Sequence, residues 1–156
     1  MPNTPSLLPR MDRRDRRYPD RPFIGVGAVV FKEESVLLIQ RGRPPRQGSW
    51  SLPGGLQEVG ETVFAAAARE VLEETGLTIR VIELVEVVDS ITRDPEGRTQ
   101  YHYTLVDVRA EWRAGEAVAA DDAEGVSWAP LDALNSYDLW SETERVIQLA
   151  AAQRIK

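Results

Sequence analysis

Glutamates crowd one short segment of this 156-residue chain, at Glu61, Glu70, Glu73 and Glu74. Residues three and four apart are neighbours on a helix, so the last three would share one face. Like charges at these spacings repel each other by a few tenths of a kcal/mol per pair, and the C-terminal end of a helix disfavours anions. A hard divalent cation such as Mg²⁺, held by oxygen ligands and bridging to substrate phosphates, would relieve both effects. The alternative is a solvated acidic helix face.

The sequence around these glutamates predicts the helix that must position them, over residues 62–75. Thr62 can cap its N-terminus, and Gly76 suits the position that follows its C-terminus. Six residues recur at helical spacing and would share one face of this helix: Val63, Ala66, Ala67, Glu70, Val71 and Glu74.

The stretch GLQEVGETVFAAAAREVLEETGL at 55–77 fills every defined position of the pattern G-x5-E-x7-R-E-U-x-E-E-x-G-U, in which U is aliphatic. The matching residues are Gly55, Glu61, Arg69, Glu70, Val71, Glu73, Glu74, Gly76 and Leu77. The chain therefore resembles the Nudix hydrolases, closely over this box and by strand order from about Arg21 to Arg154. The resemblance implies an α/β/α sandwich with a curved mixed sheet. It also implies an enzyme that uses Mg²⁺ or Mn²⁺ to cleave a nucleoside diphosphate linked to another group.

The resemblance assigns metal binding to Glu70, Glu73 and Glu74, with the carbonyl group of Gly55 as a further ligand. Glu73 or Glu74 would also orient or deprotonate the attacking water. From the residues alone, the helix remains either a metal site or an acidic surface.

Two supporting roles and one alternative base follow from the same resemblance. Arg69 would hold a glutamate through a charge-assisted bond, and Glu61 would support the metal cluster. In some relatives the base comes from a later loop, which here points to Asp122. That loop offers three acidic residues, Asp121, Asp122 and Glu124, and a solvated acidic loop is the alternative.

Candidate substrate contacts precede the box, at Arg41, Arg43 and Trp50. The planar guanidinium group suits phosphate, and we favour Arg41 over Arg43. Trp50 could stack on a base or pack in the core. In the strand around His102, alternation places Tyr101 and Tyr103 on one face, where either could line a pocket.

The substrate is left open between several nucleotide classes. Relatives that prefer ADP-ribose or dinucleoside polyphosphates often carry Pro or Tyr some way after the box, and Pro95 lies near that distance, so we favour ADP-ribose or a nucleotide sugar. Nucleoside triphosphates and dinucleoside polyphosphates are the enzymatic alternatives. A non-catalytic nucleotide-binding module is the alternative of another class, and the intact box counts against it.

Patterning predicts strands at 23–31, 35–41, 78–92, 100–112 and 126–131, and a second helix over 141–154 capped by Ser141 with Glu144. The "EE" of 33–34 predicts a hairpin, 42–50 a loop, and 93–99 a turn. We expect residues 1–20 to be a flexible arm and residues 21–156 the Nudix domain.

Composition bounds location and partners. The net charge of −6 argues against nucleic-acid binding. No apolar run approaches a membrane span, and the absence of cysteine favours a reducing, cytoplasmic setting. We expect a small nucleotide derivative as substrate, and a homodimer through the arm as a further hypothesis.

Overall fold

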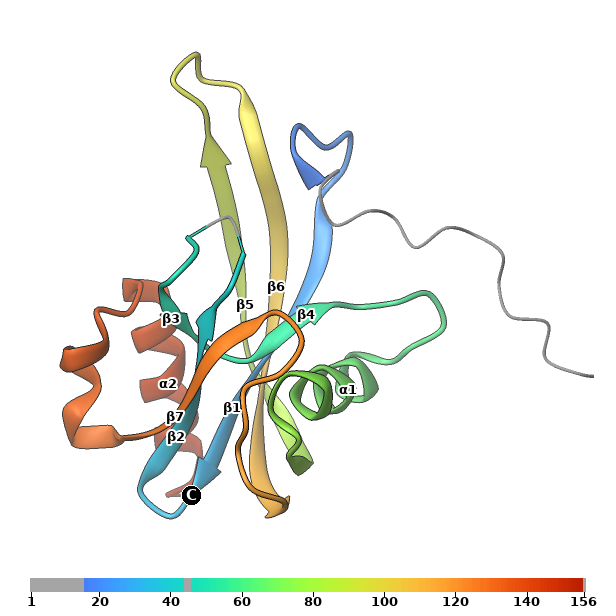
Figure 1. Ribbon diagram of the computed structural model, residues 1–156. Coiled ribbons are helices and arrows are strands. Elements are labelled where there is room, and N and C mark those ends of the chain that lie inside the picture. Colours follow the sequence, from blue (N-terminus) through green and yellow to red (C-terminus); the bar gives the residue numbers. More distant parts are fainter. Residues whose placement is uncertain (1–15, 44–45, 156) are drawn as a thin grey trace, which may run out of the picture.

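The computed structural model describes residues 16–43 and 46–155. A seven-stranded mixed sheet separates two α-helices, with α1 (Val63–Thr75) and α2 (Ser141–Gln153) on opposite faces (Figure 1). This arrangement confirms the α/β/α sandwich with a mixed sheet expected from the sequence.

The sheet follows the order β3-β2-β1-β6-β5, with β4 paired to β1 and β7 paired to β2. Its strands are β1 (Phe23–Lys32), β2 (Ser35–Arg41), β3 (Trp50–Ser51), β4 (Gly54–Leu56), β5 (Thr78–Arg93), β6 (Thr99–Ala114) and β7 (Ala123–Pro130). The β1–β6 pair is parallel and the other pairs are antiparallel. A 3-10 segment, η2 (Leu131–Tyr137), leads from β7 towards α2.

Side-chain alternation along β1 builds two cores, one beneath each helix. Val26, Ala28 and Val30 pack on the α1 side, and Val29 and Phe31 on the α2 side. The buried apolar run of this strand is therefore explained by helices covering both faces of the sheet.

Local sequence signals predicted most element ends correctly. The Thr62 hydroxyl accepts a hydrogen bond from the Ala65 N–H at 3.1 Å, and Gly76 ends α1 with φ = 74°. This left-handed conformation is easily reached only by glycine. The 33–34 hairpin is confirmed, because Lys32 pairs with Ser35.

Three differences from the sequence predictions concern pairing and capping. The predicted loop 42–50 ends one residue too late, since Trp50 pairs with Gln40 and begins β3. Strand β7 begins at Ala123 rather than 126, because its first residues extend the ladder with β2. The capping box at Ser141 is wrong: α2 begins one residue earlier than expected, so Trp140 is the N-cap residue and makes no side-chain cap bond.

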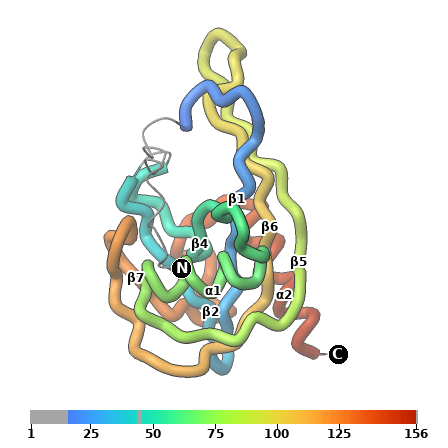
Figure 2. The backbone as a smooth tube through the Cα atoms, turned by 90° about the vertical axis from the view of Figure 1, so that its right-hand side faces the viewer, coloured from blue at the N-terminus to red at the C-terminus, as the bar shows by residue number. Residues whose placement is uncertain are grey.

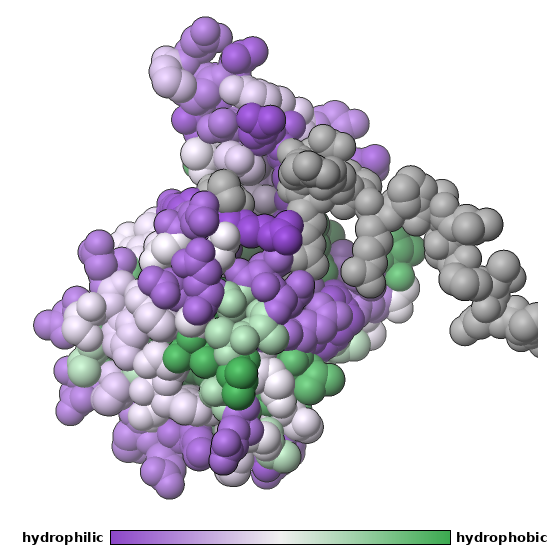
Figure 3. Space-filling view, in the orientation of Figure 1, coloured by the Kyte–Doolittle hydropathy of each residue, from purple (hydrophilic) through white to green (hydrophobic). Residues whose placement is uncertain are grey.

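The long β5–β6 hairpin projects beyond the sandwich, and its tip carries hydrophilic residues (Figure 3). The segment that precedes β1 lies beside this tip (Figure 2). There the Tyr18 hydroxyl donates a hydrogen bond to Asp94 at 2.9 Å, and the Tyr18 N–H bonds the Gln100 carbonyl at 2.8 Å. Residues 1–15 of the expected arm lie outside the described residues.

Candidate active site

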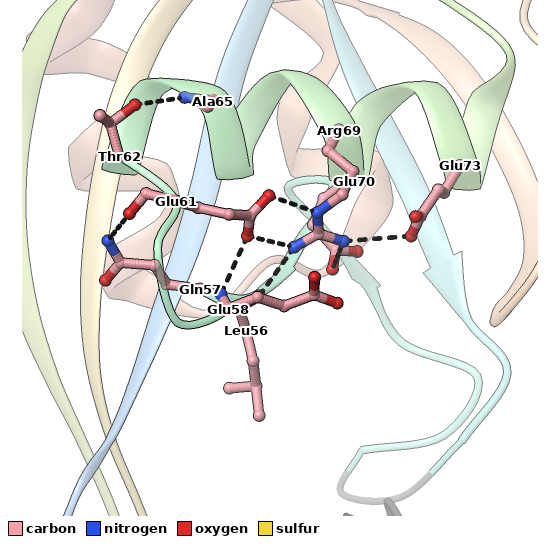
Figure 4. Close-up of polar contacts among 9 residues, drawn as sticks. All are labelled: Leu56, Gln57, Glu58, Glu61, Thr62, Ala65, Arg69, Glu70 and Glu73. Carbon is pink, nitrogen blue, oxygen red and sulfur yellow. Dashed lines mark hydrogen bonds and ion pairs between the residues drawn. The ribbon is translucent and has the colours of Figure 1, made fainter. Parts of the chain in front are cut away.

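Arg69 is the centre of a polar network at the start of the predicted metal site (Figure 4). Its guanidinium group makes two hydrogen bonds to Glu61, at 2.7 and 2.9 Å. It also reaches Glu70 at 2.8 Å, Glu73 at 3.2 Å and the Leu56 carbonyl at 3.0 Å. A planar fork with five donors suits this many acceptors, and one side chain thus joins the helix to the loop before it.

These contacts shift the pKa values of the groups in the network. The hydrogen bonds that Arg69 donates to Glu61 hold the pKa of Glu61 below its usual value and raise the pKa of Arg69. Arg69 contacts three glutamates of the box, and Glu61, which accepts two of its hydrogen bonds, is its main partner.

Glu70 and Glu74 are buried against the short strand β4. The Glu74 carboxylate accepts a hydrogen bond from the Gly54 N–H at 2.7 Å. A Cβ atom at residue 55 would collide with the carboxyl group of Glu70. The two glycines that open the box therefore allow the helix carboxylates to approach the strand backbone.

Burial raises the pKa of Glu74 to about 8, and the negative charge of Glu70 adds to this shift. Only 4% of Glu74 is exposed. Burial is the larger cause, so the shift reflects mainly the loss of solvent around this carboxyl group, and neighbouring negative charge contributes less.

Glu73 is more exposed than these two side chains. Its side chain is 42% exposed and its carboxylate pairs with Arg69. Over residues 16–43 and 46–155, no three or more Asp, Glu, His or Cys side chains are placed to hold a metal ion.

The donor chemistry nevertheless fits a hard divalent cation. The groups that meet at β4 offer only oxygen, from Glu70, Glu74 and the backbone of Gly55. A bound cation would also offset the repulsion between Glu70 and Glu74. Mg²⁺ and Mn²⁺ prefer such ligands.

The two aspartates in the loop before β7 interact with different charged groups. Asp122 forms an ion pair with Arg43 at 2.8 Å, at the end of β2. The charge of Asp121, in contrast, reaches Glu74 and contributes to its raised pKa. The loop is tied to the end of α1, since the Ala120 N–H bonds the Glu74 carbonyl.

A cavity of about 560 Å³ opens on the other side of β4. Gly54 and Gly55 line it, so the same short strand touches both the cavity and the helix carboxylates. Arg41 and Trp50 also line it, whereas Arg43 does not. The strand β4 thus lies between the cavity and the carboxylates of α1.

Two further arginines that sequence reasoning missed line the cavity, Arg16 and Arg46. Burial lowers the pKa of Arg41, and the positive charges of Arg16 and Arg46 lower it further. The guanidinium groups of Arg16 and Arg46 are thus each near enough to repel that of Arg41, although the chain as a whole is acidic. Arg46 also lies over the Trp140 ring, 4.8 Å from its centroid.

The cavity wall on β6 follows the alternation read from the sequence. Tyr101, Tyr103, Leu105 and Asp107 line it in turn, and His102 faces the other way. The sequence analysis missed Asp107. It lies four residues after Tyr103 and is therefore on the same face of the strand.

Residues 21–150 match the family model of the NUDIX domain, so the chain belongs to the Nudix family of pyrophosphohydrolases.

Three known proteins are similar to this chain over most of its length. The chain is 36% identical to an ADP-ribose pyrophosphatase of Methanocaldococcus jannaschii, over 82% of this chain and 73% of that protein. It superposes on a MutT NUDIX hydrolase from Burkholderia pseudomallei with a TM-score of 0.72 and 32% identity, covering 83% of this chain and 98% of the other. For an ADP-ribose pyrophosphatase from Streptococcus suis the TM-score is 0.63, the identity 26%, and the coverage 85% and 92%. Among the helices of the described residues, none is long and apolar enough to cross a membrane.

Proposed function

We propose that this Nudix enzyme hydrolyses ADP-ribose or a similar nucleoside diphosphate linked to a sugar. The observation that carries the proposal is the arginine-lined cavity that shares β4 with the helix carboxylates. The proposal is supported by the similarity to two proteins named ADP-ribose pyrophosphatase. A diphosphate between two bulky groups needs a roomy cavity and positive charge at its centre.

The residues of this chain would divide the work as follows. Arg41, with Arg46 beside it, would bind phosphate oxygens. Trp50 would form part of the wall around the nucleoside. Gly55, Glu70, Glu73 and Glu74 would hold Mg²⁺ or Mn²⁺. When bound, the ion supplies Lewis acidity and lowers the pKa of water.

Arg69 would keep Glu70 and Glu73 in position, and Glu61 would in turn hold Arg69. Water attacks one phosphorus, the bridging P–O bond breaks, and the proton of the water passes to a carboxylate. The products are two monophosphates. Glu73, Glu74 and Asp122 are the candidate bases, and Asp122 would first have to leave its ion pair with Arg43.

The test is product release from a panel of substrates, in the presence of Mg²⁺ or Mn²⁺. ADP-ribose, a nucleotide sugar, a dinucleoside polyphosphate and a nucleoside triphosphate cover the four classes. We expect ADP-ribose to give AMP and ribose 5-phosphate, and the Glu74→Gln variant to be at least about 100-fold slower, because it loses a charged group at the reacting centre. Faster turnover of the triphosphate would overturn the substrate assignment and leave the enzyme class unchanged.

The homodimer expected from the sequence stays part of this proposal. Sedimentation of the full chain measures it directly. A mass of 17.5 kDa, that of one chain, would contradict it.

A further inference from the structure

Asp107 is a carboxylate in the wall of the cavity, and neither the box nor the proposed chemistry uses it. It lies on β6 and is 6% exposed. Among the residues that the structure describes, none donates a hydrogen bond to its carboxylate. The carboxylate therefore takes its hydrogen bonds from whatever fills the cavity. An occupant that offered no donor would leave it unsatisfied, at a cost of about 1–3 kcal/mol, and more when it is charged.

The surroundings of Asp107 leave room for this carboxylate. Gly27 of β1 is its partner in the parallel ladder, and a Cβ atom at residue 27 would collide with the Asp107 Oδ1 atom. The nearby charge is that of Glu86, which opposes ionisation of Asp107 rather than pairing with it. Glu86 is itself paired with Arg145 at 2.9 Å. The fold therefore makes space for Asp107 without satisfying it.

The neighbours of Asp107 suit a flat aromatic ring more than a hydroxylated sugar. Leu52, Val88 and Leu105 line the same part of the cavity, and all three belong to the apolar cluster of the α2 face. A ribose would bury several hydroxyl groups against this wall, each of which would need a partner. A nucleobase presents apolar faces and a few donors and acceptors at its edge.

Asp107 is also at a suitable place relative to the helix carboxylates. Gly27 pairs with Asp107 on one side and with Gly54 on the other. Two strand spacings of about 4.8 Å separate the Asp107 and Gly54 backbones by about 10 Å. A nucleoside can span this separation between its phosphate and its base.

We propose that Asp107 is a specificity-determining residue that accepts a hydrogen bond from the exocyclic amino group of the substrate nucleobase. The inference rests on the proposed function in one respect, namely that a nucleotide enters this cavity. It adds a choice among nucleotides, because an amino base satisfies the carboxylate and an oxo base presents a second acceptor to it. The enzyme then discriminates adenine from hypoxanthine, and cytosine from uracil.

The experiment compares ADP-ribose with its hypoxanthine analogue, IDP-ribose, in the wild-type enzyme and in Asp107→Asn. We expect the wild type to prefer ADP-ribose by kcat/KM about tenfold or more, the scale of one hydrogen bond to a charged group. The asparagine amide can donate to an oxo group, so the variant should lose this preference or reverse it. The change should appear in KM, with kcat for ADP-ribose almost unaltered. If Asp107 had a purely structural role, its replacement would change kcat/KM for both substrates by the same factor.

Asp89→Asn is the matched control, since Asp89 is an exposed aspartate on β5 that does not line the cavity. It should keep the wild-type preference. Asp107→Ala, which cannot donate to an oxo group, should lose the preference without reversing it. Thermal unfolding of each variant separates misfolding from altered specificity, and calorimetric binding of AMP and IMP gives the same comparison without turnover.

Two outcomes overturn the inference. An equal kcat/KM ratio in wild type and Asp107→Asn contradicts it. An equal loss for both substrates indicates contact with a sugar hydroxyl group instead, which contradicts it as well. If ADP-ribose is not hydrolysed, the proposed substrate fails, and the inference is tested separately on CTP against UTP and on dATP against dITP.

Discussion

Arg69 shows how one side chain can organise several carboxylates. Its five donors are shared among Glu61, Glu70, Glu73 and the Leu56 carbonyl. A pairing of Arg69 with Glu73 four residues on could be read from the sequence. The contact with Glu61 spans the loop before the helix, and only the fold of that loop brings the two together.

Replacing Arg69 with lysine keeps the charge and removes the planar fork. We expect kcat to fall about 10- to 100-fold, the usual cost of losing a partner that orients catalytic ligands, while KM changes little. Steady-state kinetics of Arg69→Lys measures this. Arg98→Lys is the control, since Arg98 pairs with Asp94 and Glu96 at the hairpin tip. Equal kinetics for Arg69→Lys and wild type would refute the role of the fork.

Asp107 makes stability depend on pH in a direction unusual for an acid. Burial and the charge of Glu86 raise its pKa to about 6, whereas an unfolded aspartate has a pKa near 3.9. Between these values the folded chain holds a proton that the unfolded chain has released. The contribution of this group to stability is therefore greatest below about pH 4 and is lost as pH rises to about 6.

Asp107→Asn removes this titration. We expect the variant to gain stability relative to wild type as pH rises from about 4 to about 7, by an amount on the order of 2–3 kcal/mol. Guanidinium unfolding across this range measures the difference, and Asp89→Asn controls for loss of a surface carboxylate. A difference between variant and wild type that stays constant with pH would show that Asp107 is not perturbed by its site.

At the scale of elements, β4 was the strand that the sequence predicted least well. Both ends of α1 could be predicted from the sequence, because the Thr62 cap and the terminal Gly76 are local signals. The three residues of β4 are too few to show a period, and their strand geometry comes from pairing with β1. The Ser141 cap failed for a related reason, since packing sets where α2 begins and a short motif does not.

Gly55→Ala tests whether β4 and the helix must touch. The new methyl group would meet the Glu70 carboxyl group, so strand and helix would separate slightly. We expect kcat to fall about tenfold or more, since small displacements of positioned groups are costly. Gly97→Ala is a contrasting control: residue 97 has open space and φ = 84°, so the variant should lose stability and keep activity. Full activity of Gly55→Ala would show that the contact is dispensable.

At the scale of the whole molecule, one short strand lies between a helix rich in carboxylates and a cavity lined by three arginines. Carboxylates gather on the α1 side of β4, and arginines line the cavity beyond it. The sequence predicted the acidic half, because the box is contiguous. Arg16 and Arg46 come from segments that only the folded chain brings to the cavity, and no local pattern distinguishes them from solvated residues.

The acidic half should bind a divalent cation and be stabilised by it. A ligand that binds only the folded state adds RT ln(1 + [L]/Kd) to the free energy of unfolding, which is about 2.7 kcal/mol at 100 times Kd. We therefore expect Mg²⁺ or Mn²⁺ to raise the unfolding temperature, and EDTA to reverse the rise and abolish turnover.

Glu70→Gln should greatly reduce this thermal shift, because it removes a buried carboxylate at β4. Glu96→Gln, at the exposed hairpin tip, should keep it. Unfolding scans with increasing metal concentration give an apparent Kd for each variant. An equal shift in Glu70→Gln and wild type would place the cation elsewhere on the protein, and the crowding of glutamates on α1 would then need another explanation than metal binding.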